Sequence, residues 1–528
     1  MPPNFEPWWA HQVTHPLQSP DSARPVNVDG LILDALELSP RIQAISRIPL
    51  IEETRIAEED SEFDLQTFME HSFDRPSDPV GSELTTGGPP RFREEHWNSS
   101  AGVRRRNRLG STIEGSQEVG YKHNNSEFFS PREQGLSRLV LGFTQPLLRG
   151  AGREYNTAPT VLAQIDAAVA DSEFSAELQQ QLIKVNRAYW QVYFERASLL
   201  QKRQLYTQAR DIHAELRARQ AIDATQSQLM RARAAVAARY SELARADQNI
   251  RNAETRLRAL VGYPALSPAQ PGELVPRDTP RPYRSPVPLE DVRRAALEHR
   301  PEMEVALDKV RAASVRLGVS ENELLPTIDL VAETYVQGLA ARGNVGESLA
   351  NQFSVGEPGA SVGLQFELPW SRRRARSVHD RRRLELQRVQ SELDATARHI
   401  VSEVDVAVGE LRTTYREMQG KYHAMVAAQE DVEYLNKRWR TLPGEDRSAS
   451  LVLEDLLDAQ MRATVEQNKF VQAQVNHMLA FVELKRATGT LLQYEQITRE
   501  RTVTDCLPDM SLSKGHPRTT DFPVRREN

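Results

Sequence analysis

The stretch NIRNAETRLRALVG at residues 249–262 decides the fold, because a related stretch, NHMLAFVELKRATG, returns at residues 476–489, 227 positions later. A second pair lies near the beginning of each half, where ALELSP at 35–40 corresponds to ALEHRP at 296–301, 261 positions later. Related segments that recur in the same order are typical of a duplicated structural unit. The chain is therefore predicted to contain two copies of one unit rather than several unrelated domains.

Short strand-like segments separate these motifs, at about residues 63–146 in the first half and 327–369 in the second. Glycine and proline punctuate both regions densely, which predicts turns between strands. The first region is longer by about one hairpin, at residues 97–123. Each copy of the unit is therefore predicted to hold strands, with an additional pair in the first copy.

Long helices give the strongest periodic signal. No proline or glycine occurs between about residues 160 and 220, and about 60 residues at 1.5 Å rise would form a rod of about 90 Å. Apolar residues then recur every three or four positions from Leu229 to Leu260, a heptad-like pattern that predicts helices packed side by side at shallow angles. Residues 376–440 and 450–488 repeat this plan. Four such rods indicate a helical tube or stalk.

The predicted fold is mainly α with a β portion, built from a duplicated unit of short helix, strands and long helical hairpin. A helix face begins at Asp29, and Pro49 is expected to kink or end that helix. The predicted segments are a disordered N-terminal segment 1–26; a first repeat 27–264 with strands at about 63–146 and long helices at about 158–262; a Pro-rich linker 265–287; a second repeat 288–492 with strands at about 327–369 and long helices at about 376–489; and a disordered tail 493–528.

Composition and motifs exclude several classes of protein. A net charge of −6 argues against nucleic-acid binding despite the arginine clusters at 104–106 and 372–383. The lone Cys506 permits neither a disulfide framework nor a cysteine-based metal site. No HExxH, GxSxG or phosphate-binding glycine loop occurs, so we predict no catalytic residues, no cofactor and no metal. No stretch approaches 18 consecutive apolar residues, and no membrane-spanning helix is predicted.

Over about residues 27–492 the chain resembles the TolC-like outer-membrane efflux proteins. The motifs that carry the resemblance are the paired ALELSP and ALEHRP segments, FTQPLLRGAG (143–152), LLPTIDLVAETY (324–335), LEDLLDAQ (453–460) and LKRATG (484–489). The resemblance implies a homotrimer in which strands from three chains close one β-barrel in the outer membrane. It also implies that the long helices continue this barrel as a coiled-coil tube through the periplasm.

Physical reasoning agrees with closure by three chains, because open sheet edges in lipid would leave backbone groups unpaired. Leu139, Leu141 and Phe143 alternate with Val140, Gly142 and Thr144, as expected for one lipid face and one lumen face. The additional hairpin at about 97–123 exceeds the usual strand count of the family. The sequence leaves its position open, with the extracellular and the lumenal side as candidates.

The resemblance also implies partners, namely a periplasmic adaptor (membrane fusion) protein that meets the helix tips and an inner-membrane pump. The candidate docking residues lie at the two tip turns and are Ala221, Ile222, Asp223, Leu442, Pro443, Gly444, Glu445 and Asp446. Tip acids, including Glu454 and Asp455, could form a ring that favours cations, although solvated turns are slightly preferred.

Basic residues lie where strands give way to helices in both halves. The candidate contacts to lipid headgroups are Arg149, Arg153, Arg372, Arg373 and Arg374, with a solvated helix start as an equally good interpretation. Packing between helices is the preferred interpretation of the aromatic patch formed by Tyr189, Trp190, Tyr193 and Phe194. A buried core histidine is preferred over a metal ligand at His477.

These observations predict an outer-membrane exit duct of a tripartite efflux or type I secretion system, through which cargo passes passively. The alternative is a coiled-coil scaffold in the cytoplasm or periplasm, which would have no need of the strand segments. The first 25 residues contain six prolines and no readable secretory signal, so an outer-membrane location carries the expectation of a misassigned or truncated start. Neither the cargo nor the particular pump can be named from the sequence.

Overall fold

The computed structural model describes residues 2, 5–17, 23–221, 224–263, 272–281, 287–441 and 447–494. The chain divides into two compact units, and both draw on both halves of the sequence. The helical unit comprises residues 1–48, 171–305 and 394–528, and the sheet unit comprises residues 49–170 and 306–393. Each repeat therefore contributes strands to the sheet unit and most of a long helical hairpin to the helical unit.

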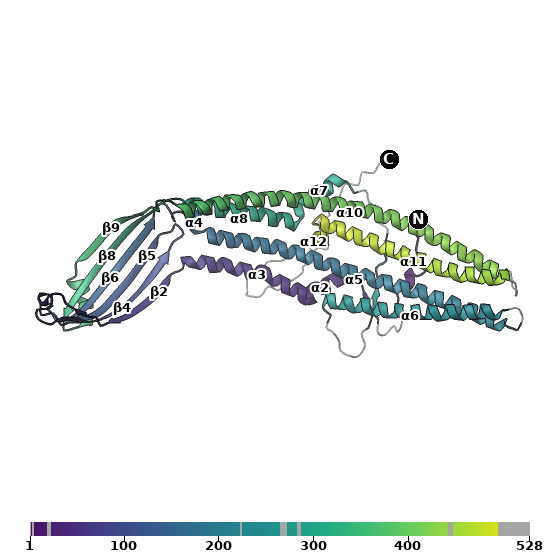
Figure 1. Cartoon of the computed structure of the whole chain (residues 1–528), viewed down its shortest axis with the longest axis horizontal. Helices are drawn as coiled ribbons and strands as arrows, with labels where there is room; N and C mark the ends of the chain where they lie inside the picture. The colour runs from purple at the N-terminus through teal and green to yellow at the C-terminus, as the bar shows by residue number, and fades with distance from the viewer. Residues whose placement is uncertain are drawn as a thin grey trace. The chain divides into compact units, whose positions relative to one another are not determined.

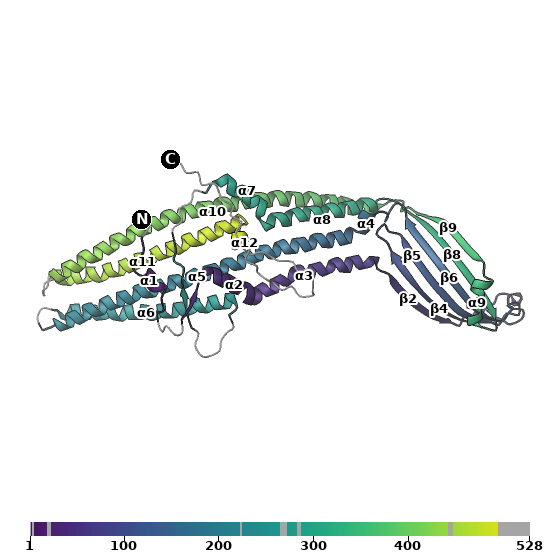
Figure 2. The same cartoon turned by 180° about the vertical axis from the view of Figure 1, so that it is seen from behind.

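Long helices dominate the helical unit (Figures 1 and 2). Helices α5 (Ala158–Ala218) and α6 (Gln226–Val261) form the hairpin of the first repeat. Helices α10 (Arg373–Thr441) and α11 (Arg447–Ala487) form that of the second. A capping box opens α6, in which Thr225 Oγ1 accepts a hydrogen bond from Gln228 N and Thr225 N donates to Gln228 Oε1 at 2.9 Å. This cap allows the first return helix to begin without a glycine.

Shorter elements complete the helical unit, and some of its helices continue along the chain into the sheet unit. They are α1 (Ala10–Val13), α2 (Val28–Leu38), α7 (Leu289–His299), α12 (Leu491–Tyr494) and the strands β1 (Ala23–Val26) and β7 (Glu273–Pro276). Helices α3 (Pro40–Asp60) and α8 (Pro301–Glu323) begin in the helical unit, and most of their residues belong to the sheet unit. Of the two expected effects of Pro49, a kink or the end of the helix, the end is wrong, because α3 runs through Pro49. The break comes at Ser39, which is extended because it precedes Pro40, and Pro40 occupies the first helical turn, where no backbone donor is needed.

The repeated motifs contact each other in the same way in both halves. Gly262 and Gly489, which follow α6 and α11, have positive φ values of 86° and 71°. A Cβ added at Gly262 would lie 2.4 Å from Leu38 O, and one added at Gly489 would lie 2.5 Å from His299 O. Each glycine therefore lets the end of a hairpin approach the backbone at the end of the short helix of its own repeat. This approach explains why the two motifs recur together.

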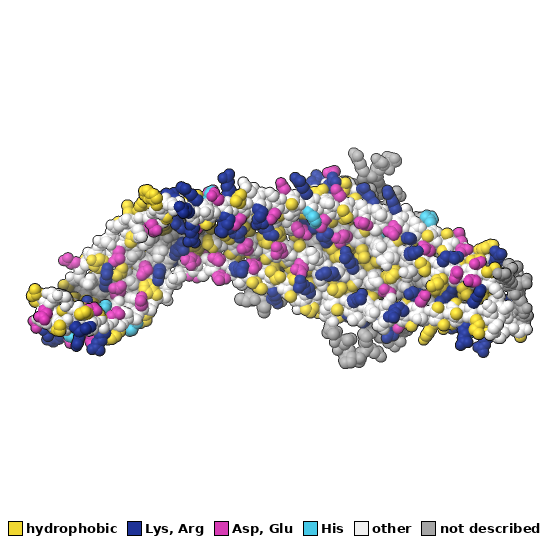
Figure 3. Space-filling view, viewed as in Figure 1, with side chains coloured by type: hydrophobic (Ala, Val, Ile, Leu, Met, Phe, Trp, Pro, Cys, Tyr) yellow, Lys and Arg dark blue, Asp and Glu magenta, His cyan; other side chains and the backbone are white. Residues whose placement is uncertain are grey.

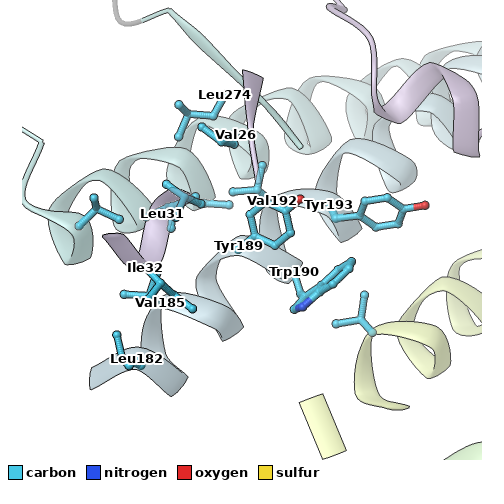
Figure 4. Close-up of a cluster of buried hydrophobic side chains, with 14 of the residues drawn as sticks. Val26, Leu31, Ile32, Leu182, Val185, Tyr189, Trp190, Val192, Tyr193 and Leu274 are labelled. Atoms are coloured by element: carbon cyan, nitrogen blue, oxygen red, sulfur yellow. The ribbon is translucent and has the colours of Figure 1, made fainter. Parts of the chain in front are cut away.

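The predicted aromatic patch lies in a large buried cluster of the helical unit. Tyr189, Trp190 and Tyr193 of α5 are each at most 3% exposed, and the rings of Tyr189 and Trp190 meet edge to face with centroids 5.2 Å apart. Figure 4 shows Tyr189 near Leu31 and Ile32 of α2, and all three aromatic side chains belong to the same buried cluster as these residues. The interpretation of the patch as packing between helices is confirmed.

Buried polar side chains join the two hairpins. Arg239 of α6 is 5% exposed, and its guanidinium donates to Leu205 O of α5 at 3.1 Å and to Leu457 O of α11 at 2.9 Å. Burial lowers the pKa of Arg239 to about 10.

His477 of α11 is 1% exposed and its Nδ1 lies 3.2 Å from Thr414 Oγ1 of α10, so the prediction of a core histidine is confirmed.

The prediction of a disordered N-terminal segment is wrong for the residues around α1 and β1. Trp9 and Val13 are fully buried, and β1 pairs in parallel with β7, which lies within the predicted linker 265–287. The fully buried Arg196 of α5 holds both segments, because it pairs with Glu273 of β7 and its Nε donates to Val13 O at 2.9 Å. Burial lowers the pKa of Arg196, and the Glu273 carboxylate opposes this shift. The predicted tail 493–528 lies almost wholly outside the described residues.

The sheet unit is built around antiparallel strands in the order β2-β4-β5-β6-β8-β9, with the short β3 also paired to β4. Their bounds are β2 (Gln66–Asp74), β3 (Ser77–Pro79), β4 (Arg91–Arg106), β5 (Thr112–Asn124), β6 (Glu133–Pro146), β8 (Thr327–Ala341) and β9 (Pro358–Glu367). The additional hairpin, whose position the sequence left open, is β4 with β5, and it is inserted in the sheet between β2 and β6. No described helix is both long and apolar enough to cross a bilayer.

We predict that Gly489→Ala lowers the free energy of unfolding by more than about 1 kcal/mol, because alanine is strained at positive φ and its Cβ would meet His299 O. The matched control is Gly420→Ala, within α10, where an added Cβ meets nothing within 4 Å. That substitution should raise the free energy of unfolding by about 0.5–1 kcal/mol. Denaturant titration followed by circular dichroism measures both, and effects of the same sign would contradict the role given to Gly489.

Candidate functional site

The sheet has an apolar face. Directly opposite residues of an antiparallel pair share a face, so the register fixes which side chains lie together. Leu139, Leu141 and Phe143 of β6 lie on one side, as their alternation predicted. The apolar face also carries Met69, Phe73, Val103, Ile113, Val362, Leu364 and Phe366. Most of these side chains are exposed in the single chain, and Val362 reaches 76%.

The opposite side of the sheet is a charged face. Its members are Glu70, Glu94, Arg104, Glu114, Glu118, Lys122, Arg138 and Glu333. Arg138 Nη2 lies 2.6 Å from Glu333 Oε1, and Lys122 Nζ lies 3.0 Å from Glu94 Oε2. Arg138 and Glu333 stay more than a third exposed. A face of exposed ion pairs is suited to water and not to hydrocarbon.

Helix α9 (Val345–Ser354) lies on the apolar face, packed against β5, β6 and β8. It covers two of the polar side chains on this face, Gln117 and Ser137, while His71, Ser99 and Arg105 share the face on β2 and β4. Gln117 Nε2 donates to Gln352 Oε1 at 3.0 Å, and Ser137 Oγ donates to Ser348 O at 2.8 Å. A Cβ added at Gly338 would lie 2.0 Å from Ser348 O, so β8 meets the helix backbone directly. The sequence analysis predicted strands and turns for residues 327–369, and it did not predict this helix.

Two strand edges of the sheet carry no partner within the part of the chain that is described. Strand β2 pairs only with β4, and β9 pairs only with β8. Both edge strands present exposed apolar side chains, among them Phe73 at 65% and Phe366 at 63%. Long apolar edge strands of this kind are templates for pairing with another chain.

The five predicted headgroup contacts lie where strands end and helices begin. Arg149 N donates to Pro326 O at 3.3 Å and the Arg372 guanidinium donates to Leu324 O at 3.1 Å, so both segments attach to the turn before β8. Arg153 begins the short helix α4 (Arg153–Asn156), and Arg373 begins α10. Figure 3 shows Lys and Arg side chains gathered around the start of α10.

This basic start is electrostatically unfavourable for α10 itself. Arg373 and Arg374 are exposed in its first turn, which contains no acidic residue. A helix N-terminus favours negative charge by about 0.3–1 kcal/mol per group, so two arginines there oppose the helix dipole. Helix stability therefore gives no reason for their placement, and their role as headgroup contacts stays a prediction.

Trp370 is a surface residue that the sequence reading missed. It is 98% exposed, between the end of β9 and the start of α10. Leu147 and Leu325, at 47% and 42% exposure, belong to the neighbouring turns. The sequence does contain a pattern that points to Trp370. A tryptophan directly after an alternating strand and before a run of arginines is typical of a membrane interface.

The tip turns are only partly described. Ala221 ends the described part of the first turn, whereas Ile222, Asp223 and all of Leu442, Pro443, Gly444, Glu445 and Asp446 lie outside the described residues. Of the tip acids, Glu454 accepts a hydrogen bond from Arg231 Nη1 at 2.7 Å. Its charge is thus already paired within the chain. Among the described residues no group of three or more His, Cys, Asp or Glu is placed to hold a metal ion.

Solved structures of outer membrane proteins have a similar architecture. No protein-family model and no curated protein sequence matches the chain. Among solved structures, the outer membrane protein VceC of Vibrio cholerae has a TM-score of 0.61 at 16% identity, over 88% of this chain and 96% of VceC. A membrane protein from Pseudomonas aeruginosa has a TM-score of 0.63 at 17% identity, over 88% and 93%.

The outer membrane channel CmeC of Campylobacter jejuni has a TM-score of 0.62 at 12% identity, over 88% of this chain and 86% of CmeC. The chain has the TolC-like fold. The resemblance predicted from the repeated motifs is thereby confirmed at the level of the fold. Three features of this chain bear on its function. Its sheet has one apolar and one charged face, both edge strands of the sheet are unpaired in the described chain, and helix α10 begins with arginines.

We predict that Gln352→Leu loosens α9 by about 1–3 kcal/mol, because the amide of Gln117 then loses its partner. Replacing both residues, as Gln117→Leu with Gln352→Leu, should restore most of this loss, since no polar group is left unpaired. Hydrogen exchange of residues 345–354 measures the opening of α9. Additive effects in the double variant would contradict the direct Gln117–Gln352 contact.

Proposed function

We propose that this chain is the outer-membrane exit duct of a tripartite efflux or type I secretion system, and that it moves cargo passively. The observation that carries the proposal is the sheet with one apolar and one charged face. Such a sheet suits a wall between lipid and water, with the apolar face toward lipid and the charged face toward a lumen. A coiled-coil scaffold would have no use for it.

The free edges of β2 and β9 support closure by copies of the same chain. The path β2-β4-β5-β6-β8-β9 has six strands, so a homotrimer, as the resemblance implies, would close a barrel of three times six, or about 18, strands. Barrels of about 16–18 strands enclose an aqueous channel. The inserted hairpin β4–β5 thus widens the proposed duct by two strands for each chain.

The height of the apolar face fits a membrane. On β5, Ile113 and Tyr121 share this face eight residues apart, which is about 27 Å along the strand. At a tilt of about 40° this gives about 20 Å along the barrel axis, close to the apolar band of about 25 Å in outer-membrane barrels. Trp97 and Tyr121 lie toward one end of the face, and Phe366 lies toward the other.

The helix-side rim would then lie at the inner boundary of the membrane. The exposed Trp370 and the arginines at the start of α10 are suited to lipid headgroups, Trp370 through its amphipathic ring and the arginines through phosphate. Beyond this rim, the long hairpins would form a periplasmic tube. Its tips, at 219–226 and 441–450, would meet an adaptor protein and an inner-membrane pump, which supplies the energy.

Reconstitution tests the duct directly. We expect the purified chain to give stable single-channel currents in planar bilayers. In Glu333→Gln the reversal potential in a salt gradient should move toward anion preference, because Arg138 on the charged face loses its counter-charge. The matched control is Glu347→Gln, the same change on α9, where Gln can keep the capping contact to Asn344; it should leave the reversal potential unchanged.

Absence of currents from correctly assembled protein would contradict the proposed duct. So would equal shifts in Glu333→Gln and Glu347→Gln, because the charged face would then not line the path of the ions. Export by cells that lack the chain, complemented by wild type, gives the corresponding test of function in the envelope.

A further inference from the structure

Helix α9 has an inverted pattern of burial. Its polar residues Ser348 and Gln352 are fully buried, whereas Leu349 and Phe353 are 39% and 68% exposed, and the adjoining Val355 is 76% exposed. A helix on the surface of a water-soluble protein shows the opposite arrangement. The outward side of α9 therefore presents apolar side chains that no contact within the described chain covers.

Polar residues on the sheet explain why the polar side of α9 is buried. Gln117 and Ser137 are polar residues on the apolar face of the sheet, on the strands that α9 covers, while His71, Ser99 and Arg105 share this face on β2 and β4. The α9 backbone and Gln352 satisfy them at 2.8–3.0 Å. Unpaired polar groups are costly wherever water is excluded. The helix thus covers this polar area of the face with an outer side that carries Leu349 and Phe353.

The position of α9 along the strands bears on why its exposed side is apolar. Asn344, its N-cap, lies against Gly135 near the outer end of β6, where an added Cβ would lie 2.6 Å from the Asn344 carbonyl. Gln352 contacts Gln117, which is opposite Leu139, four residues further along β6. The helix therefore runs from the end of the strands toward the middle of the apolar face. Its C-terminal residues, Phe353 among them, lie level with that middle.

We infer that the outward side of α9, formed by Leu349, Phe353 and Val355, binds lipid acyl chains in the outer part of the membrane. This inference rests on the proposed function, which assigns the apolar face to lipid. A second copy of the chain is a poorer occupant, because α9 packs on the inner strands β5, β6 and β8, whereas the free edges are those of β2 and β9. Apolar side chains on a polar-backed helix at the membrane boundary suit acyl chains instead.

Site-directed spin labelling of the assembled protein in phosphatidylcholine vesicles tests the inference. With Cys506→Ser as background, a nitroxide is attached at Phe353→Cys and its collisions with oxygen, which partitions into lipid, and with a water-soluble nickel chelate are compared. Leu141→Cys is the reference for the apolar face, Gln337→Cys for the charged face, and Glu347→Cys for water on the same helix. Leu349→Cys is the second reporter if Phe353→Cys fails to assemble.

We expect position 353 to resemble position 141, with high oxygen and low chelate accessibility, while positions 337 and 347 remain open to the chelate. If 353 follows 347 while 141 reports lipid, the inference on α9 is wrong and the proposed duct stands. If 141 also reports water, the membrane placement itself fails and the inference fails with it. Dipolar broadening between labels at 353 would show a neighbouring copy in place of lipid and would also overturn the inference.

Discussion

The central constraint on this chain is the alternation of its strands. A sheet that is apolar on one side and charged on the other cannot satisfy both sides in a single solvent. Placed between lipid and water, it satisfies both, but its two free edges must then be paired, because the hydrocarbon region offers backbone groups no other partner. The proposed closure with further copies and the proposed contact of α9 with lipid both rest on this requirement.

In the helical unit the long helices pack without a globular core, and specific contacts fix their positions. Gly262 and Gly489 let each hairpin meet the short helix of its own repeat by backbone approach, so the duplication is also a repeated contact. Buried polar groups then fix the alignment of neighbouring rods. Arg239 joins three helices, and Arg196 holds the N-terminal segment and β7 on α5.

Much of the fold was predictable, because helix length, heptad spacing and strand alternation are local properties of the sequence. What could not be predicted depends on contacts between distant residues. The ordering of the segment around Trp9 comes from Arg196, more than 180 positions away. Alternation alone could not say that the hairpin β4–β5 lies within the sheet. Helix α9 was missed because its apolar residues point outward, against the usual pattern, and Trp370 was missed as a lone residue between two clear motifs.

Crosslinking of the two free edges tests the central claim most directly. In the Cys506→Ser background, a cysteine at Ser72 of β2 is combined in turn with one at Gly359, Ser361 or Gly363 of β9, all on the charged face. Closure by three chains predicts that oxidation of the assembled protein in at least one of these pairs gives a ladder that ends at three covalently joined chains. Only single chains in every pair, or a ladder that continues beyond three, would contradict the closed wall.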